Sequence, residues 1–510
     1  MPSPHPTPGS IRRAIALTAC LGLAVVGVST AAPSSAEPAP GGDSSTFPVA
    51  QDLRHTGRWF TDAQGRAVVI HGTNMINKFA PYTPDALGFG EDDLAFLAEN
   101  GFNAIRLGFT WAGVEPAPGQ YDDVYIDKIV ALAEDAADHG LMPVVNFHQD
   151  GYGETYGGNG APAWASISYG IPGLTFLPAP ANVLPGAAIA NENFWANVKA
   201  PDGIGLQDHY AAAWKHVAQR FGDDPHTVFE VDNEPSPGIL DVATCALPIG
   251  CPLFDLLKLA PFHRKVLSSI RQVDSDRLVF VEPQAFFGLG ARTWLPSMRD
   301  PQVGFAFHNY CALALAPLPL PIPSAPCDVL TGLNLANAQA QFKATGEPLL
   351  MDEFGAGDTD LVVESLLNQA DKQMLSWMHW AYWGQDFGHD ATYGLINDIS
   401  KPPSGDNIKQ GLLKVLTRPS PRIIAGTPLS WMWDKATSTF QAQYTSARAD
   451  GNGSFPAGSV SEFFLHPRFF PGGYRVQVTG GTVISAPDAS RLKVAALPGT
   501  TITVTVTPAS

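Results

Sequence analysis

Two glutamates stand at corresponding points of two sequence segments that read as buried strands. Glu234 lies in Val231-Asp232-Asn233-Glu234-Pro235, and Glu353 lies in Met351-Asp352-Glu353-Phe354-Gly355. Each follows a short apolar run, so each carboxylate is expected at the end of a strand. Two carboxyl groups about 5–5.5 Å apart can cleave a glycosidic bond with retention, because one attacks the anomeric carbon while the other protonates the leaving oxygen. We therefore predict Glu353 as the nucleophile and Glu234 as the acid/base.

Further polar and aromatic residues stand on or after other expected strands. Arg106 could keep the nucleophile ionised through a charge-assisted hydrogen bond, and Tyr310 could donate to Glu353. Asn233 could bind a sugar 2-hydroxyl, and Trp383 offers a flat face for a sugar ring. The alternative for Arg106 is an ion pair of the core, and a lone His or Trp would normally be core. The remaining predicted members of the site are His148, Asp150 and His308.

The elements that would position these residues alternate between apolar strands and longer helical patterns. Good helices are expected over 91–100 and 122–139, each ending at a glycine. Eight strands are the number that a TIM (β/α)8 barrel needs, and we predict this barrel over 48–417. A doubly wound open sheet is disfavoured because no glycine-rich phosphate turn follows the first strand. The expected strands are 68–74, 104–109, 142–147, 227–231, 278–281, 303–307, 348–351 and 379–382.

The pattern changes at both ends of the barrel segment. Residues 59–70 predict a hairpin with its turn at Gln64-Gly65. After Arg418-Pro419-Ser420-Pro421, short alternating runs and turn signals predict a β-sandwich over 418–510. We favour a packing or stabilising role for this accessory domain over a carbohydrate-binding role.

The first residues predict an export signal. Arg12 and Arg13 precede an apolar run over 14–28 that is short for a membrane span, and small residues follow. We expect a signal peptide over 1–36, a disordered linker over 37–47 and a secreted protein. Lipid anchoring at Cys20 is the less favoured alternative, because much of the apolar stretch follows the cysteine.

Composition and the remaining cysteines narrow the classes further. Hydrophobic residues make up 45% and charged residues 15%, which excludes general disorder, and the net charge of −17 argues against a nucleic-acid partner. The other four cysteines are expected in disulfides, with local pairing favoured among three connectivities and four unpaired thiols as the alternative. Their spacing is no zinc pattern, so we expect no metal. The favoured pairs are Cys245–Cys251 and Cys311–Cys327.

Three long loops are unusually apolar: 165–195, 237–262 and 311–331. Each follows the carboxyl end of an expected strand, so all three are expected on the catalytic face of the barrel. Either they pack on each other as a small satellite core, or they form an apolar trough beside a sugar site.

The motifs together resemble glycoside hydrolase family 5 and, within it, the endoglycoceramidases. The specific marks span roughly 50–510: Val114-Glu115-Pro116-Ala117-Pro118-Gly119-Gln120-Tyr121, Phe147-His148-Gln149-Asp150, Gly158-Asn159-Gly160-Ala161-Pro162-Ala163-Trp164-Ala165 and Ile424-Ala425-Gly426-Thr427-Pro428. The resemblance implies hydrolysis of the bond between glycan and ceramide in glycosphingolipids of a membrane or micelle. It places the family's sugar-contacting Lys and Asp on Lys78 and Asp150. It also implies that the apolar loops form a groove for the ceramide lipid beside the sugar site.

Other functions stay open at this point. A β-glucosidase of simple glycolipids or steryl glucosides and an endoglucanase are the nearest alternatives. A non-catalytic glycolipid-binding protein and a structural envelope protein belong to other classes, and neither requires both glutamates. We expect no organic cofactor, and a monomer.

Overall fold

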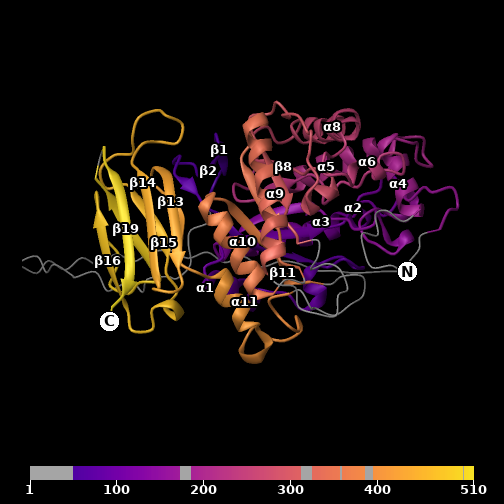
Figure 1. The fold of residues 1–510 in the computed structure, drawn as a ribbon. Helices are drawn as coiled ribbons and strands as arrows, with labels where there is room; N and C mark the ends of the chain where they lie inside the picture. The colour runs from indigo at the N-terminus through magenta and orange to yellow at the C-terminus, as the bar shows by residue number, and fades with distance from the viewer. Residues whose placement is uncertain are drawn as a thin grey trace, which may run out of the picture. The chain divides into compact units, whose positions relative to one another are not determined.

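The computed structural model describes residues 50–172, 185–311, 324–356, 359–384, 394–497 and 499–509. Its centre is a closed barrel of parallel strands with helices around it (Figure 1). This confirms the predicted TIM barrel, and the strands are almost entirely buried, as continuous apolar runs require. The barrel strands are β4 (His71–Ile76), β5 (Ala104–Phe109), β6 (Met142–Phe147), β7 (Val228–Glu230), β8 (Val279–Val281), β9 (Val303–His308), β10 (Leu349–Glu353) and β11 (Ser376–Trp383).

The first barrel strand differs from its prediction. The apolar run over 67–70 reads as one piece with 71–74, but it is shared between two sheets. The short strand β3 (Ala67–Val68) pairs with β12 (Ser420–Ile424) of the C-terminal region, and Val69 N–H also donates to the Arg422 carbonyl at 2.9 Å. The barrel strand β4 then begins only at His71. Alternation cannot show this division, because both parts are buried.

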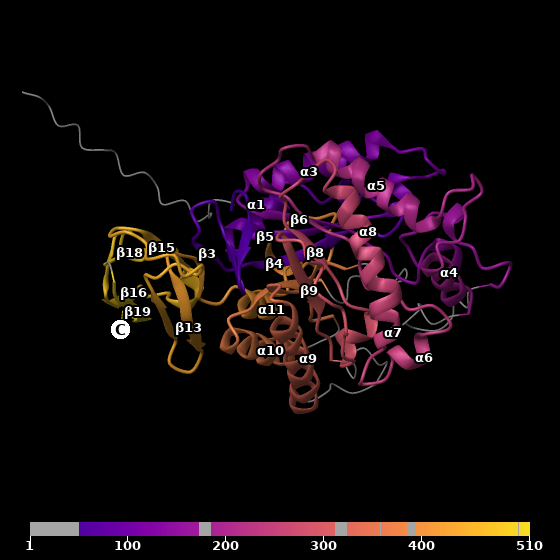
Figure 2. The ribbon, with the colours of Figure 1, turned by 90° about the horizontal axis from the view of Figure 1, so that it is seen from above.

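Helices cover the barrel wall, and their ends carry the expected capping signals (Figure 2). The Asp122 carboxylate accepts from Tyr125 N–H at the start of α3, and Thr359 does the same for Val362 N–H at the start of α10. The longer helices are α1 (Glu91–Glu99), α3 (Asp123–Asp138), α4 (Pro185–Trp195), α5 (Leu206–Phe221), α8 (Ala260–Ile270), α9 (Ser324–Thr345), α10 (Asp360–Lys372) and α11 (Gln410–Leu416).

Two antiparallel sheets form the predicted C-terminal sandwich, with alternate residues buried between them. The four-stranded sheet has the order β13-β14-β19-β16, and the seven-stranded sheet has the order β1-β2-β3-β12-β15-β18-β17. Trp431 Nε1–H donates to Asp371 of α10 at 2.9 Å, which ties a sandwich strand to a barrel helix. The remaining strands are β1 (Arg54–Thr56), β2 (Trp59–Thr61), β13 (Thr427–Asp434), β14 (Thr439–Thr445), β15 (Val460–Phe464), β16 (Tyr474–Thr479), β17 (Gly481–Val483), β18 (Arg491–Ala496) and β19 (Thr501–Pro508).

The larger sheet contains three strands from before the barrel, which the sequence assigned to the barrel segment 48–417. Strand β2 pairs with β3, as the predicted hairpin requires, and β3 continues the sheet through β12. The sandwich is therefore built from both ends of the described chain.

The structure joins Cys245 to Cys251 and Cys311 to Cys327, so the favoured local disulfide pairing is confirmed. Residues 173–184 and 312–323, which hold much of two apolar loops, lie outside the described residues. Among the helices that the structure does describe, none combines the length and the apolar character needed to cross a membrane.

Candidate active site

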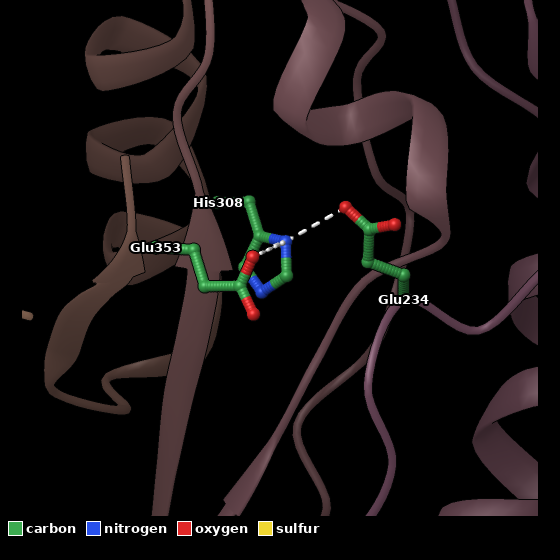
Figure 3. A group of neighbouring side chains, drawn as sticks. All are labelled: Glu234, His308 and Glu353. Carbon is green, nitrogen blue, oxygen red and sulfur yellow. Dashed lines mark hydrogen bonds and ion pairs between the residues drawn. The ribbon is translucent and has the colours of Figure 1, made fainter. Parts of the chain in front are cut away.

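The two predicted glutamates converge at the carboxyl ends of their strands. Glu234 follows β7 and Glu353 ends β10, and their side chains point toward each other across the barrel mouth (Figure 3). One oxygen from each carboxylate and one His308 nitrogen all lie within 4.8 Å of one another. This spacing is of the order that retaining glycosidases use. Glu234 has a backbone φ of 47°, an uncommon conformation for a residue other than glycine, and such conformations gather at functional sites.

His308, the last residue of β9, connects the two carboxylates. Its Nδ1 lies 2.8 Å from Glu234 Oε1 and 3.3 Å from Glu353 Oε2. Its Nε2 lies 3.3 Å from Glu282 Oε1. Burial opposes the charged ring, but attraction by Glu282 and Glu353 outweighs it and holds the pKa of His308 well above its usual value. A protonated imidazole thus fixes the orientation of both glutamates.

Arg106 and Tyr310 hold the carboxylate of Glu353. Arg106 Nη1 donates to Glu353 Oε1 at 2.5 Å, and the Tyr310 hydroxyl donates to Oε2 at 2.7 Å. Both donors are buried, so both bonds are shielded from water. Charge-assisted hydrogen bonds of this kind give a carboxylate a defined orientation. The pair can therefore hold Glu353 in place for attack on a sugar.

Lys78 and Asp150, which the resemblance assigned to sugar contact, form an ion pair. Lys78 Nζ lies 2.8 Å from Asp150 Oδ2 and 4.6 Å from the centre of the Trp380 ring. The His148 ring stacks on the same Trp380 ring, and the two ring centres are 5.4 Å apart. Burial favours the neutral acid, but Lys78 outweighs it and holds the pKa of Asp150 well below its usual value. The group offers charged donors and acceptors to sugar hydroxyls.

The last two predicted residues differ in how closely they engage the glutamates. The Asn233 Oδ1 accepts from Arg106 at 2.9 Å, and its Nδ2 donates to the Gln149 carbonyl at 3.0 Å. Trp383 ends β11, opposite Met75 of β4, and is only partly buried. Its ring therefore remains able to meet a ligand.

Sequence reasoning missed a layer of acidic residues beneath the site. Glu230 accepts from Arg106 Nε at 2.9 Å, and Asp352 lies 3.4 Å from the same nitrogen. Glu282 accepts from the Glu234 backbone N–H at 3.0 Å and so holds the acid/base segment. Burial raises the pKa of Glu282, and the charged ring of His308 opposes this shift. Glu230 is a charged residue in an otherwise apolar strand, and this feature of the sequence could have identified it as part of the site.

Two sets of described side chains could hold a cation, and both include His308. In the first, with Glu234 and Glu353, His308 Nδ1 already contacts both carboxylates. In the second, with Glu282 and Asp352, His308 Nε2 already lies 3.3 Å from Glu282. The expectation of a site without metal or organic cofactor stays a prediction.

Replacing Tyr310 by Phe removes one donor from Glu353 without changing the shape of the side chain. A hydrogen bond to a charged group contributes about 1.5–3 kcal/mol, so we expect kcat to fall about tenfold to a hundredfold. The loss should be equal for lipid and aryl glycosides, because both need the same nucleophile. Steady-state kinetics on both substrates measures it, and an unchanged kcat would show that Arg106 alone suffices.

Asp232 supplies a stability prediction. Its Oδ1 accepts from the Tyr210 hydroxyl at 2.9 Å, and burial raises its pKa to about 8. The folded state therefore keeps a proton that the unfolded chain loses above about pH 4, and stability falls with pH by about 1.4 kcal/mol per unit until pH 8. Asp232→Asn mimics the neutral acid and has no such slope. The free energy of unfolding is measured in urea at pH 5 and pH 7.5. The value for the variant should rise relative to that of wild type at the higher pH. A difference between the two proteins that is the same at both pH values would contradict the prediction.

Two family descriptions match the chain. Residues 61–386 match "Cellulase (glycosyl hydrolase family 5)", and residues 418–506 match "Glycoside hydrolase family 5 C-terminal domain". The first match covers more than half of the chain and contains both glutamates of the site.

Several characterised endoglycoceramidases are similar to this chain over most of their length. Endoglycoceramidase I of Rhodococcus hoagii (strain 103S) is 28% identical over 462 residues, which cover 87% of this chain and 86% of that protein. Endo-glycoceramidase II from Rhodococcus sp., solved as a lactosyl-enzyme intermediate, has a TM-score of 0.71 and 29% identity. Its ganglioside GM3 complex has a TM-score of 0.70 and 28% identity. Both structures cover 89% of this chain and 100% of theirs.

The alternatives without catalysis are excluded by the family match, which spans the barrel and its two converging glutamates. Retention of configuration is general in this family. The chain therefore belongs to glycoside hydrolase family 5, and it is a retaining glycoside hydrolase similar to the endoglycoceramidases.

Proposed function

We propose that this enzyme hydrolyses the bond between the glycan and the ceramide of glycosphingolipids by double displacement. The observation that carries the proposal is the pair of carboxylates with oxygens within 4.8 Å, held by His308 and Arg106. The similarity to endoglycoceramidases over most of both chains supports the choice of substrate.

In the first step Glu353 attacks the anomeric carbon, and the bond to the ceramide oxygen breaks. Glu234 gives its proton to that oxygen, so ceramide leaves as a neutral alcohol, and a glycosyl ester forms on Glu353. Arg106 and Tyr310 position the attacking carboxylate. Negative charge on Glu353 is consumed as the ester forms, and both donors stay in place to receive the carboxylate when it leaves again.

In the second step water attacks the same carbon from the face that ceramide left. Glu234, now a carboxylate, accepts the proton of the water, and the ester bond to Glu353 breaks. Two inversions give a glycan with its original β configuration. Lys78, Asp150 and Asn233 are the side chains that we assign to sugar hydroxyls, and Trp383 is assigned to a ring face.

A substrate panel tests the proposal. The purified enzyme is incubated with a glycosphingolipid, a steryl glucoside, a simple alkyl glucoside and a soluble β-glucan, each in the same detergent. We expect an intact glycan and free ceramide from the first substrate at a kcat/KM far above the others. Preferential cleavage of the β-glucan or the steryl glucoside would contradict the assignment of glycosphingolipid as the substrate.

We also propose that the enzyme is exported, with residues 1–36 removed, and acts as a monomer. Arg12, Arg13 and the apolar run after them support the export signal. The mass and N-terminal sequence of protein from the culture medium test the cleavage site. A lipid-modified Cys20 as the first residue would instead place the enzyme at a membrane.

A further inference from the structure

An exposed apolar surface lies on the loop between β7 and α8. The leucine patch consists of Leu240, Ile249, Leu253, Leu256, Leu257 and Trp294, all more than two-fifths exposed. Leu253 and Leu257 are 68% and 69% exposed, whereas Phe254 and Leu259 of the same segment are fully buried. The helical turns α7 (Pro252–Phe254) and η5 (Asp255–Leu259) thus have one face in the core and one face of leucines in solvent.

The polar groups of this segment are engaged with one another. Lys258 Nζ lies 2.6 Å from both Glu192 and Asp241. Asp255 Oδ2 accepts from the Trp294 backbone N–H at 2.6 Å and from Thr293. The charges of this segment are therefore paired or buried, and its outward face is left to aliphatic groups.

The patch is also held rigidly. The Cys245–Cys251 disulfide closes the loop, and Trp294 Nε1–H donates to the Ile249 carbonyl at 2.8 Å. The Arg292 backbone N–H donates to the Pro248 carbonyl at 3.1 Å. The leucines are consequently fixed outside the core, although the same loop buries both cysteines. Several exposed apolar side chains on one ordered loop are the feature that marks an interaction site.

The position of the patch links it to the active site. Its loop begins directly after Glu234-Pro235, and Trp294 belongs to the segment after the next barrel strand, β8. The Ala285 N–H donates to the Pro235 carbonyl at 3.1 Å, which joins the two segments beside the acid/base. The Ile239 N–H donates to the Ala188 carbonyl of α4 at 3.0 Å, so the first part of this loop lies against α4.

We propose that the leucine patch docks the enzyme on the lipid surface that carries its substrate. The proposal rests on the proposed function, since a glycosphingolipid presents its scissile bond at the surface of a membrane or micelle. Leucines and a tryptophan suit insertion at that boundary. The patch lies on segments that follow β7 and β8, and such segments lie at the same end of the barrel as Glu234. With a net charge of −17, the chain gains nothing from anionic lipids, so docking should depend on apolar contact and persist in high salt.

The test uses phosphatidylcholine vesicles without glycolipid, so that it is independent of catalysis. We expect wild-type enzyme to sediment with them at low and high salt. Leu253→Ser/Leu257→Ser should weaken this binding by about tenfold or more, because leucine surface no longer leaves water. The matched control is Leu361→Ser/Leu429→Ser, whose leucines are 67% and 46% exposed on α10 and β13. The control should bind like wild type.

Kinetics on the same variants completes the test. For glycosphingolipid in vesicles, kcat/KM of the patch variant should fall by a factor similar to its loss of binding, while a soluble aryl glycoside is cleaved as before. The docking proposal is overturned if wild type does not sediment with the vesicles, or if the patch variant binds them as well as wild type does. It is also overturned by a wild-type dimer that the patch variant converts to monomer, since the patch would then join two copies. Absence of glycan release from detergent-dispersed glycosphingolipid instead defeats the proposed function, whatever the vesicles show.

Discussion

Replacing Glu353 by Ala is expected to lower kcat for every glycoside by on the order of 10⁴-fold or more. Among the described residues, the neighbouring carboxylates Glu230, Glu282 and Asp352 are buried beneath the site. Asp150 is paired with Lys78, and Glu234 has the acid/base role, so none of these groups is expected to replace Glu353. The Arg106 Nη1 and the Tyr310 hydroxyl would lose the carboxylate to which they donate. Initial rates on an activated aryl glycoside measure the loss, since such a substrate is the least demanding one.

Azide provides the complementary readout for this variant. A small anion in the space left by the carboxylate can attack the anomeric carbon, and a single displacement then yields an α-glycosyl azide. Wild type should release the β anomer first in an NMR time course, because two displacements restore the configuration. An α anomer as the first product of wild type would contradict the assigned role of Glu353.

Replacing Glu234 by Gln should affect substrates according to their leaving groups. Ceramide is a poor leaving group and needs a proton, so we expect kcat/KM for glycosphingolipid to fall about 10²–10⁴-fold. An aryl glycoside with an acidic phenol needs little protonation, and its kcat/KM should stay within about tenfold of wild type. Glutamine can still bond to His308, so the positions of neighbouring groups are preserved.

The comparison of the two substrates decides the role of Glu234. Hydrolysis of the intermediate also needs a base, so the variant should accumulate glycosyl-enzyme with the aryl glycoside, visible as a burst of phenol. Equal losses in kcat/KM for both substrates would assign Glu234 a role other than proton transfer. Glu192→Gln is a suitable control, since this glutamate lies in the ion pair with Lys258 rather than in the site.

Local patterns were sufficient to predict the barrel and its pair of glutamates. The strands β5 and β6 have the predicted bounds, because each is a buried apolar run ended by a helix or turn signal. The carboxyl ends of parallel strands gather at one face, so Glu234 and Glu353 could be placed together without knowing any distance. Lys78 and Asp150 were assigned to sugar contact by resemblance alone, and their ion pair of 2.8 Å is a finding of the structure.

Contacts between distant segments were beyond such reasoning. Glu282 follows an ordinary apolar strand, and nothing in its neighbourhood shows that it accepts a bond from the Glu234 backbone. The division of the run over 67–70 between two sheets depends on β12, far along the chain. The apolar loops were expected to form either a satellite core or a trough. The loop over 237–262 has a buried side and an exposed side.

The pairing of β3 with β12 has a consequence for synthesis of the chain. While the ribosome makes the barrel, the edge of β3 that later pairs with β12 is open, because Val68 must wait for Ile423. An open strand edge is a template for pairing with another molecule. A fragment that begins at residue 418, at the start of the C-terminal family match, leaves the reciprocal edge on β12. The C-terminal region thus completes a sheet that the first strands begin, and β12 covers the open edge of β3.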